Sequence, residues 1–384
     1  MKKMRFLFAA GIGLHTISAW SINGAEMSGH GAALGMGGAT IANPHDSLVG
    51  ASNPAGMAFV GNVWDVDVSV FDGSSSSTYL VPSNAIRQSI TKAAPNLGIN
   101  YHFAPRWTVG LSAVSGGAGV NYDSAAYPGI DAPRARVSIV SSRIVNSLTY
   151  KPREDLALGL GLVIGYQGIK AQGVILPESN GSLTLLPTHG FAQAWGHGFS
   201  AGVVWQATDW LTLGASYMSK TRMGRPHGYS TDLLSSAGGR IDLPESLGVG
   251  FALHPTSSIT VAGDWKQIRW GQSEAFSTLF GWRNQNVVRA GVSWKTTPSL
   301  TLRAGVSRVS DLINSDDVAR NVYGPGISTR AYMIGASYDW NKMGRISLAY
   351  EHDPAKKVLG TGLSRGSSIN VGSRVISLSF QRSF

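Results

Sequence analysis

Three arginines, Arg289, Arg303 and Arg345, fall on the polar side of segments in which apolar and polar residues alternate. A guanidinium group binds a carboxylate through paired, charge-assisted hydrogen bonds, so these residues could hold the head group of an acidic ligand. They could equally pair with acidic side chains of the protein, because a buried charge needs a partner. The candidates for such pairing are Asp65, Asp67, Asp264 and Asp339.

Two segments fit the Gly-x-Ser-x-Gly pattern of serine hydrolases, around Ser200 and Ser364. That pattern supports catalysis only at a strand–turn–helix elbow. Ser200 lies inside an expected strand and Ser364 in an expected Gly/Ser loop, so we predict no catalytic residue and no enzyme. The nine His are scattered without metal-ligand spacing, and no nucleotide-binding loop occurs. We therefore expect neither a metal nor a cofactor.

The elements that must position the arginines are β-strands. At the carboxyl end, Ile376, Leu378, Phe380 and Phe384 alternate with mainly polar residues. Successive side chains of a strand point to opposite faces, so this segment has one apolar and one polar face. The same alternation predicts fourteen strands, at 62–72, 96–104, 106–115, 135–151, 155–170, 194–207, 209–221, 243–254, 257–270, 285–296, 298–309, 327–340, 343–352 and 371–384.

The connections between these strands alternate in length. Short links fall at 104–105, 152–154, 208, 255–256, 297 and 341–342. Long links fall at 73–95, 116–134, 171–193, 222–242, 271–284, 310–326 and 353–370. Bacterial barrels have short periplasmic turns, long extracellular loops and an even number of strands. We therefore predict an all-β fold, a transmembrane antiparallel barrel of about fourteen strands in the bacterial outer membrane.

Composition favours a barrel with lipid outside over a soluble sandwich. Trp107, Trp294 and Trp340 stand at strand ends, where aromatic rings suit the membrane interface. The opposite faces are rich in Gly, Ser and Arg, which suits a polar lumen better than a soluble core. The net charge of +10 comes from cations spread along the chain, which argues against nucleic acid as a partner. We expect a monomer surrounded by outer-membrane lipid.

The amino end precedes the barrel. Residues 1–25 combine three cations, an apolar stretch and small residues, as in a cleaved signal peptide. Residues 26–60 do not alternate and are rich in Gly, Ala and Met, so they either hang loose in the periplasm or fold into the lumen as a plug. We favour the plug, because a barrel of fourteen strands is wider than its own side chains fill. The barrel itself is expected at 61–384.

The segment around Asp46, Ser47, Asn53, Pro54, Ala55 and Gly56 resembles the hatch of the FadL/TodX outer-membrane transporters. Leu243-Pro244-Glu245 and the terminal Phe384 also resemble that family, whereas Ser52 stands where the family often has an aromatic residue. The resemblance implies an inserted hatch and a lateral opening near Gly116, Gly117 and Gly119. It also implies that the last strand is recognised by the barrel assembly machinery.

The expected function is passive outer-membrane transport of hydrophobic small molecules, which the resemblance narrows to long-chain fatty acids or aromatic hydrocarbons. Phe276, Leu279 and Phe280 make one long loop apolar, and exposed apolar patches usually bind ligands. Packing between loops would explain the same residues. The alternative function is a general porin, or a structural or adhesive barrel without specific transport.

Overall fold

The computed structural model describes residues 29–177 and 182–384. The expected signal peptide at 1–25 and residues 26–28 of the expected plug lie outside the described residues. No helix in the described part of the chain is long and apolar enough to cross a membrane.

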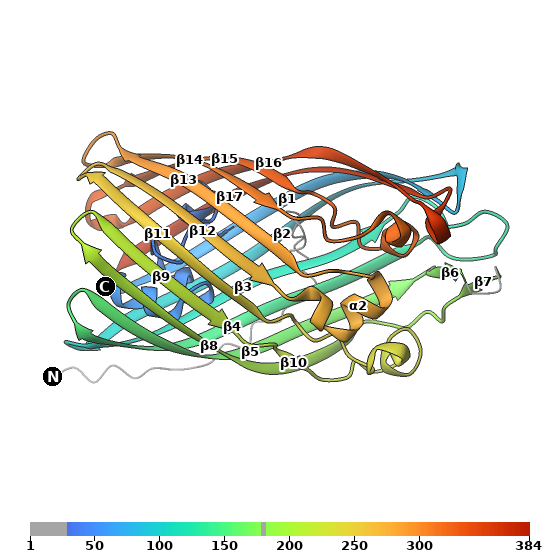
Figure 1. The fold of residues 1–384 in the computed structure, drawn as a ribbon, viewed down its shortest axis with the longest axis horizontal. Helices are drawn as coiled ribbons and strands as arrows, with labels where there is room; N and C mark the ends of the chain where they lie inside the picture. Colours follow the sequence, from blue (N-terminus) through green and yellow to red (C-terminus); the bar gives the residue numbers. More distant parts are fainter. Residues whose placement is uncertain (1–28, 178–181) are drawn as a thin grey trace.

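The described residues form a closed barrel of fourteen long antiparallel strands (Figure 1). Pairing of β8 with β9 closes the sheet, and the first and last strands, β1 and β17, pair from Val63–Ser383 to Thr78–Ser368. The expected fold class is confirmed. The strands are β1 (Val63–Tyr79), β2 (Val81–Ala104), β3 (Trp107–Asn121), β4 (Arg136–Arg153), β5 (Leu156–Gln172), β8 (Ala192–Thr208), β9 (Leu211–Met218), β11 (Ser246–Thr256), β12 (Ile259–Ile268), β13 (Gln285–Lys295), β14 (Leu300–Val309), β15 (Arg330–Asp339), β16 (Arg345–Leu359) and β17 (Ser368–Ser383).

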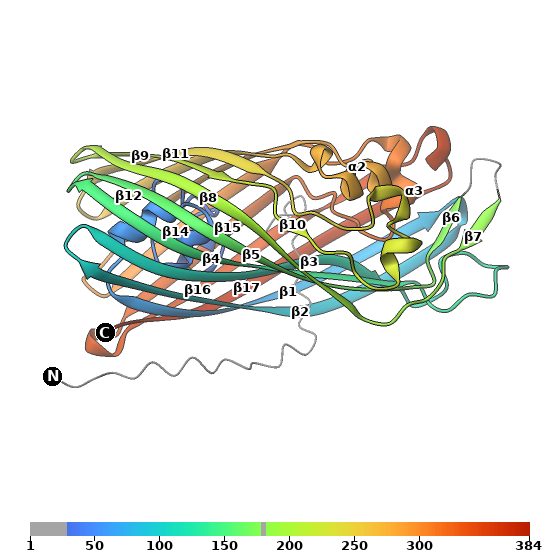
Figure 2. The ribbon, with the colours of Figure 1, turned by 90° about the horizontal axis from the view of Figure 1, so that it is seen from below.

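The two ends of the barrel differ, as Figures 1 and 2 show. Short turns and the carboxyl terminus lie at one end, which is therefore the periplasmic end. Folded loops cover the other, extracellular end. These loops contain the small strands β6 (Ile175–Pro177), β7 (Leu183–Leu185) and β10 (Arg222–Met223), and the helices α2 (Glu274–Phe280) and α3 (Val318–Asn321).

Side chains alternate between lipid and lumen as the sequence predicts. On β1, Val66 and Val68 are exposed on the outer face, whereas Asp65 and Asp67 are buried inside. On β17, Leu378 is 55% exposed on the outer face. Phe384 is 57% exposed, and its backbone N–H donates to the Asn62 carbonyl, 3.1 Å away. The last residue therefore continues the apolar row of the strand that closes the barrel.

The expected long link at 73–95 is wrong. Residues 73–79 and 81–95 extend β1 and β2, so that only Leu80, with a φ of 64°, separates the two strands. The extracellular halves of these strands carry Ser and Thr rather than an apolar row, because water and not lipid lies outside them. The lipid-driven alternation is therefore missing there, although the hairpin is paired throughout. The link expected at 353–370 is also shorter, since β16 continues to Leu359.

Replacing Leu378 by Arg tests which face meets lipid. A cation at mid-belt on the lipid face should lower the free energy of unfolding by about 2–4 kcal/mol, measured by urea titration in lipid vesicles. The control is Ser74→Arg, an exposed position on the extracellular part of β1, where the change should stay within about 0.5 kcal/mol. Equal effects at both positions would contradict the assignment of the lipid face.

Candidate functional site

Residues 29–60, here called the hatch, fold inside the barrel near its periplasmic end (Figure 1). They contain the short helix α1 (Gly31–Leu34) and the 3-10 helices η1 (Ser47–Ala51) and η2 (Pro54–Phe59). Asp46 caps η1 by accepting from the Leu48 N–H at 3.0 Å, and Asn53 caps η2 by accepting from the Ala55 N–H at 3.1 Å. Each cap satisfies a backbone donor that the first turn of a helix leaves unpaired.

Carboxylates of the barrel wall hold the hatch backbone. Asp65 on β1 accepts from the Ser47 N–H at 2.9 Å and from its hydroxyl at 2.5 Å. Asp264 on β12 accepts from the N–H groups of Thr40 at 2.7 Å and Ile41 at 3.0 Å. Hydrogen bonds to a charged acceptor are stronger than neutral ones, so these carboxylates fix the hatch on opposite sides of the lumen.

Amide side chains add further links between hatch and wall. Asn53 donates to the carbonyls of Ile41, 2.7 Å away in the hatch, and of Val203, 3.1 Å away on β8. Asn100 on β2 donates to the carbonyls of Met57 at 3.0 Å and Val60 at 2.7 Å. The Asn53 side chain thus has two roles. Its oxygen caps η2, and its nitrogen links the hatch segment at Ile41 to the barrel wall at Val203.

The hatch backbone lies directly on the barrel wall at two glycines. A Cβ atom on Gly305 would lie 2.1 Å from the Gly37 nitrogen, and one on Gly291 would lie 2.3 Å from the Met36 carbonyl oxygen. No side chain larger than hydrogen fits at either position. Small residues on the inner face of β13 and β14 therefore let the hatch pack closely against that part of the wall.

The three arginines singled out from the sequence have different surroundings. Arg345 forms an ion pair with Asp339, with Nε and Oδ1 2.7 Å apart. Arg303 donates to the Ser337 hydroxyl at 2.5 Å. Arg289 is buried on β13, opposite Asp264 in the strand register. Of the three, only Arg289 lines the main cavity described below.

Two titratable hatch residues lie near these charges. Enclosure in the barrel, with Arg303 and Arg345 nearby, lowers the pKa of His45 to about 3. Burial, together with the Asp65 carboxylate, raises the pKa of Asp46 well above its usual value. At neutral pH the His45 imidazole is therefore uncharged.

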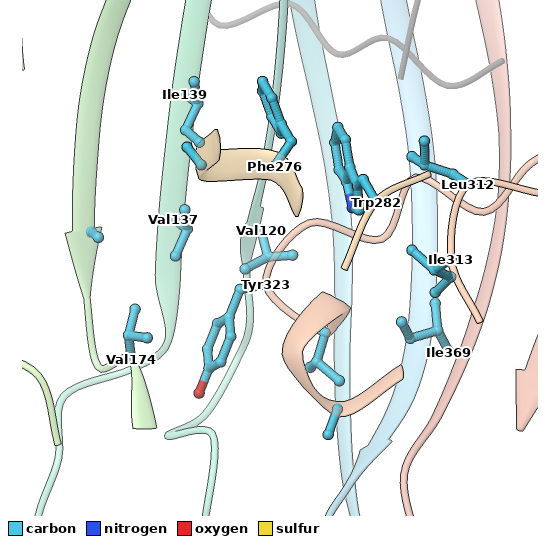
Figure 3. Packing of buried hydrophobic residues seen from close by; sticks show 14 of the residues in the cluster. Val120, Val137, Ile139, Val174, Phe276, Trp282, Leu312, Ile313, Tyr323 and Ile369 are labelled. Carbon is cyan, nitrogen blue, oxygen red and sulfur yellow. The ribbon is translucent and has the colours of Figure 1, made fainter. Parts of the chain in front are cut away.

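The main cavity, of about 170 Å³, lies between the hatch, the wall and the extracellular loops. Asp46, Leu48 and Val49 line its hatch side, and Phe276 of α2 and Trp282 line its loop side. Phe276 and Trp282, both labelled in Figure 3, stack with ring centroids 4.7 Å apart. Trp270 packs edge-on against both rings. The cavity therefore has an aromatic roof and a mixed floor.

The wall beside this cavity is interrupted. Pairing of β2 with β3 ends at Leu97–Ala113, although β3 remains paired with β4 as far as Asn121. Beyond that point the side chain of Asn96 accepts from the Ser115 N–H at 2.9 Å, and that of Gln88 accepts from the Asn121 N–H at 2.7 Å. These two bonds bracket a gap in the backbone ladder at residues 116–120.

The glycines singled out from the sequence lie in this gap. Gly116 and Gly117 line the main cavity, whereas Gly119 lines a smaller neighbouring cavity of about 30 Å³. A Cβ atom on Gly116 would meet no atom within 4 Å. Pro95 on β2 lies just beyond the last β2–β3 pair, and proline is tolerated at such an open strand edge because it has no N–H to donate.

Other expected site residues lie outside the main cavity. Leu279 and Phe280 pack against the apolar cluster under the extracellular loops. Tyr323, which the sequence analysis did not single out, belongs to the same cluster, where its hydroxyl accepts from the Ile175 N–H at 2.9 Å. Within the hatch motif, Ser47 lies on the wall beside Asp65, and Asn53, Pro54, Ala55 and Gly56 pack beside β5 and β8 or within the hatch.

Sequence reasoning did not single out several residues that line the cavity. Lys266 on β12 and Arg143 on β4 lie there, and the alternation that identified Arg289 applies to Lys266 as well. Trp270 follows β12 in a loop, where no periodic pattern marks it. Among the described residues, no group of His, Cys, Asp and Glu is arranged to hold a metal ion.

Comparisons with known proteins agree in pointing to one family. The model of a family described as outer membrane protein transport protein (OMPP1/FadL/TodX) matches residues 9–374. Outer membrane protein P1 of Haemophilus influenzae is 25% identical over 337 residues, covering 74% of this chain and 69% of that protein.

Solved structures share the fold. A FadL homologue of Pseudomonas aeruginosa superposes with a TM-score of 0.71 at 20% identity, covering 92% of this chain and 98% of that one. The toluene transporter TodX of P. putida gives 0.71 at 19% identity, with 94% and 99% covered. The toluene transporter TbuX of Ralstonia pickettii gives 0.67 at 15%, with 93% and 98% covered.

Replacing Asn53 by Ala tests how the hatch is held. Three hydrogen bonds disappear and buried carbonyls lose a donor, which costs about 1–3 kcal/mol locally. Hydrogen exchange of the Ala55 and Gly56 amides should therefore quicken roughly 5- to 150-fold, as measured by mass spectrometry. The control Asn286→Ala removes an exposed amide of β13 and should leave these amides unchanged. Unaltered exchange in the Asn53 variant would contradict the anchoring role.

Proposed function

Since the chain belongs to the OMPP1/FadL/TodX family of outer membrane transport proteins, we propose a route for its ligands. They enter the main cavity and leave sideways through the gap between β2 and β3. Membership makes the protein an outer-membrane transporter of hydrophobic compounds rather than an enzyme. The route and the ligand are the steps proposed here.

The observation that carries the proposed route is the contact between the cavity and the gap. Gly116 and Gly117 belong to both, since they line the cavity and lie where the β2–β3 ladder is open. A hydrophobic molecule in the cavity has the hatch below it and the outer-leaflet side of the bilayer beside it. Moving sideways into lipid avoids transfer through water, which apolar surface disfavours. The downhill partition into lipid needs no nucleotide.

The packing of the hatch favours this route over a general porin. The hatch backbone lies against β13 and β14 with no room for a methyl group at Gly291 or Gly305. Anchors on β1, β2, β8 and β12 hold it around the lumen. A porin requires a water-filled path along the barrel axis, so a large steady ion conductance of the purified protein in planar bilayers would contradict the proposed route.

The charges that line the cavity favour a ligand with an anionic head group. Arg143, Lys266 and Arg289 lie in the lining, and Asp46 is the single carboxylate among the described lining residues. A cationic lining attracts a carboxylate and adds little for a neutral hydrocarbon. The aromatic roof of Phe276 and Trp282 suits an apolar tail. We therefore favour a long-chain fatty acid over an aromatic hydrocarbon.

Filling the gap should block transport without unfolding the barrel. A Trp at Gly116 has space to enter, because its Cβ would meet no atom within 4 Å, and its ring would occupy the gap. The variant should lose most of its uptake of radiolabelled oleate in cells lacking another outer-membrane fatty-acid transporter. Gly190→Trp, in an exposed extracellular loop where a Cβ atom also meets nothing, is the matched control. Undiminished uptake by the Gly116 variant would rule out this exit.

Head-group recognition can be separated from tail binding. Lys266→Gln should weaken oleate binding about tenfold, because a charge-assisted hydrogen bond is lost, and should leave methyl oleate binding unchanged. Lys295→Gln, an exposed position at the periplasmic end of β13, should change neither affinity. Isothermal titration in detergent measures both ligands. Equal losses of affinity for oleate and for its methyl ester would show that Lys266 does not bind the carboxylate.

A further inference from the structure

A row of basic side chains crosses the outer surface of four neighbouring strands, just above the lipid-facing belt. Arg308 on β14, Arg330 on β15, His352 on β16 and Arg374 on β17 are all exposed. The strand register places Arg308 directly opposite Arg330, and His352 directly opposite Arg374. We call these four residues the basic row.

The basic row begins where the apolar rows end. On β14 the outward positions Leu302 and Val306 precede Arg308, and on β17 Leu378 and Ile376 precede Arg374 toward the extracellular end. Exposed apolar residues likewise precede the basic residue on β15 and β16, namely Ile334 and Tyr332, and Leu348 and Tyr350. The side chain two residues beyond the last apolar position of a lipid-facing strand reaches the level of the lipid head groups.

The arrangement of Arg308 and Arg330 calls for an anion. Like charges directly opposite each other on neighbouring strands destabilise a sheet. Among the described residues no carboxylate forms an ion pair with either guanidinium, whereas Arg374 is bonded to Asp72 at 2.8 Å. An anion lying between Arg308 and Arg330 would remove the repulsion and accept hydrogen bonds from both.

The strands that flank this sector lack the basic residue. The first outward residue beyond the exposed apolar row is Asn286 on β13, Gln267 on β12 and Asp72 on β1. The four strands β14 to β17 therefore each carry a basic side chain at a level where the flanking strands β1, β12 and β13 carry none. Exposed Lys357 of β16 lies above the same sector, opposite Asn370.

From this register and position we propose that the basic row is a binding site for a phosphorylated lipid head group of the outer leaflet. The phosphate would lie between Arg308 and Arg330, with His352 and Arg374 extending the site along the membrane surface. The acyl chains would lie along the exposed belt formed by residues such as Val306, Tyr332 and Ile334. The site lies on the outer wall, so it is independent of the cavity and of the transport route.

The test compares lipid binding by the intact protein and by Arg308→Gln/Arg330→Gln. Protein in detergent is titrated with nanodiscs of phosphatidylcholine doped with a diphosphorylated lipid A, and retained lipid is counted by native mass spectrometry. The double variant should bind the phosphorylated lipid about thirtyfold less tightly, because it loses the attraction of two basic side chains to an anionic lipid head group. The control Arg106→Gln/Arg382→Gln removes the same charge from exposed positions at the periplasmic end and should bind as the parent does.

Two outcomes would overturn the proposal. The first is an equal loss of binding in both double variants, which would indicate net charge alone. The second is binding of inorganic pyrophosphate at Arg308 and Arg330 that matches the lipid's affinity, which would make the row a site for free phosphates. Heat-dependent gel migration and oleate uptake check that each variant is folded, and both should be unchanged.

Discussion

The whole structure depends on one requirement, that backbone N–H and C=O groups in hydrocarbon must bond to each other. A sheet meets it only when it has no free edge, and here β1 and β17 join the two ends of the chain along most of their length. Closure fixes which face of every strand meets lipid. It also creates an interior that contains many Ser, Asn and Asp side chains, whose hydrogen-bonding groups need partners other than lipid.

The hatch satisfies much of that interior. Its backbone supplies N–H groups to Asp65 and Asp264 and carbonyls to Asn100, so the polar lumen and the irregular hatch complete each other's hydrogen bonds. The gap beside Gly117 is the exception to closure. It lies toward the extracellular end of β3, where the bridging side chains of Asn96 and Gln88 replace ladder bonds at its two ends. The backbone ladder of the wall is thus interrupted only where side-chain hydrogen bonds limit the number of unpaired backbone groups.

The sequence predicts the fold well wherever lipid imposes a pattern. Alternation identified all fourteen strands because each lipid-facing position must be apolar, as at Leu378 and Val68. It missed the upper hairpin of β1 and β2, because residues such as Ser74 and Ser76 face water and obey no such demand. For the site, alternation marks Arg289 and Lys266, but nothing periodic marks Trp270 or Trp282, whose loops depend on tertiary packing. The adjacency of Arg308 and Arg330 also needs the strand register, which the sequence alone does not supply.

The sector that carries the basic row and the sector that carries the gap are separated by β1 and part of β2 in the sheet order. This separation has a physical consequence. A lipid held by Arg308 and Arg330 would stay in place beside β14 to β17. Near the gap the outward residues Thr91 and Ser89 are uncharged, and exposed Arg87 stands close to its extracellular end. Beside Thr91 and Ser89 no side chain in the described part of the chain holds a phosphate, so a molecule that leaves through this part of the gap meets lipid that it can displace. The uneven charge of the rim thus suits a barrel that binds lipid at the basic row and releases its ligand into lipid through the gap.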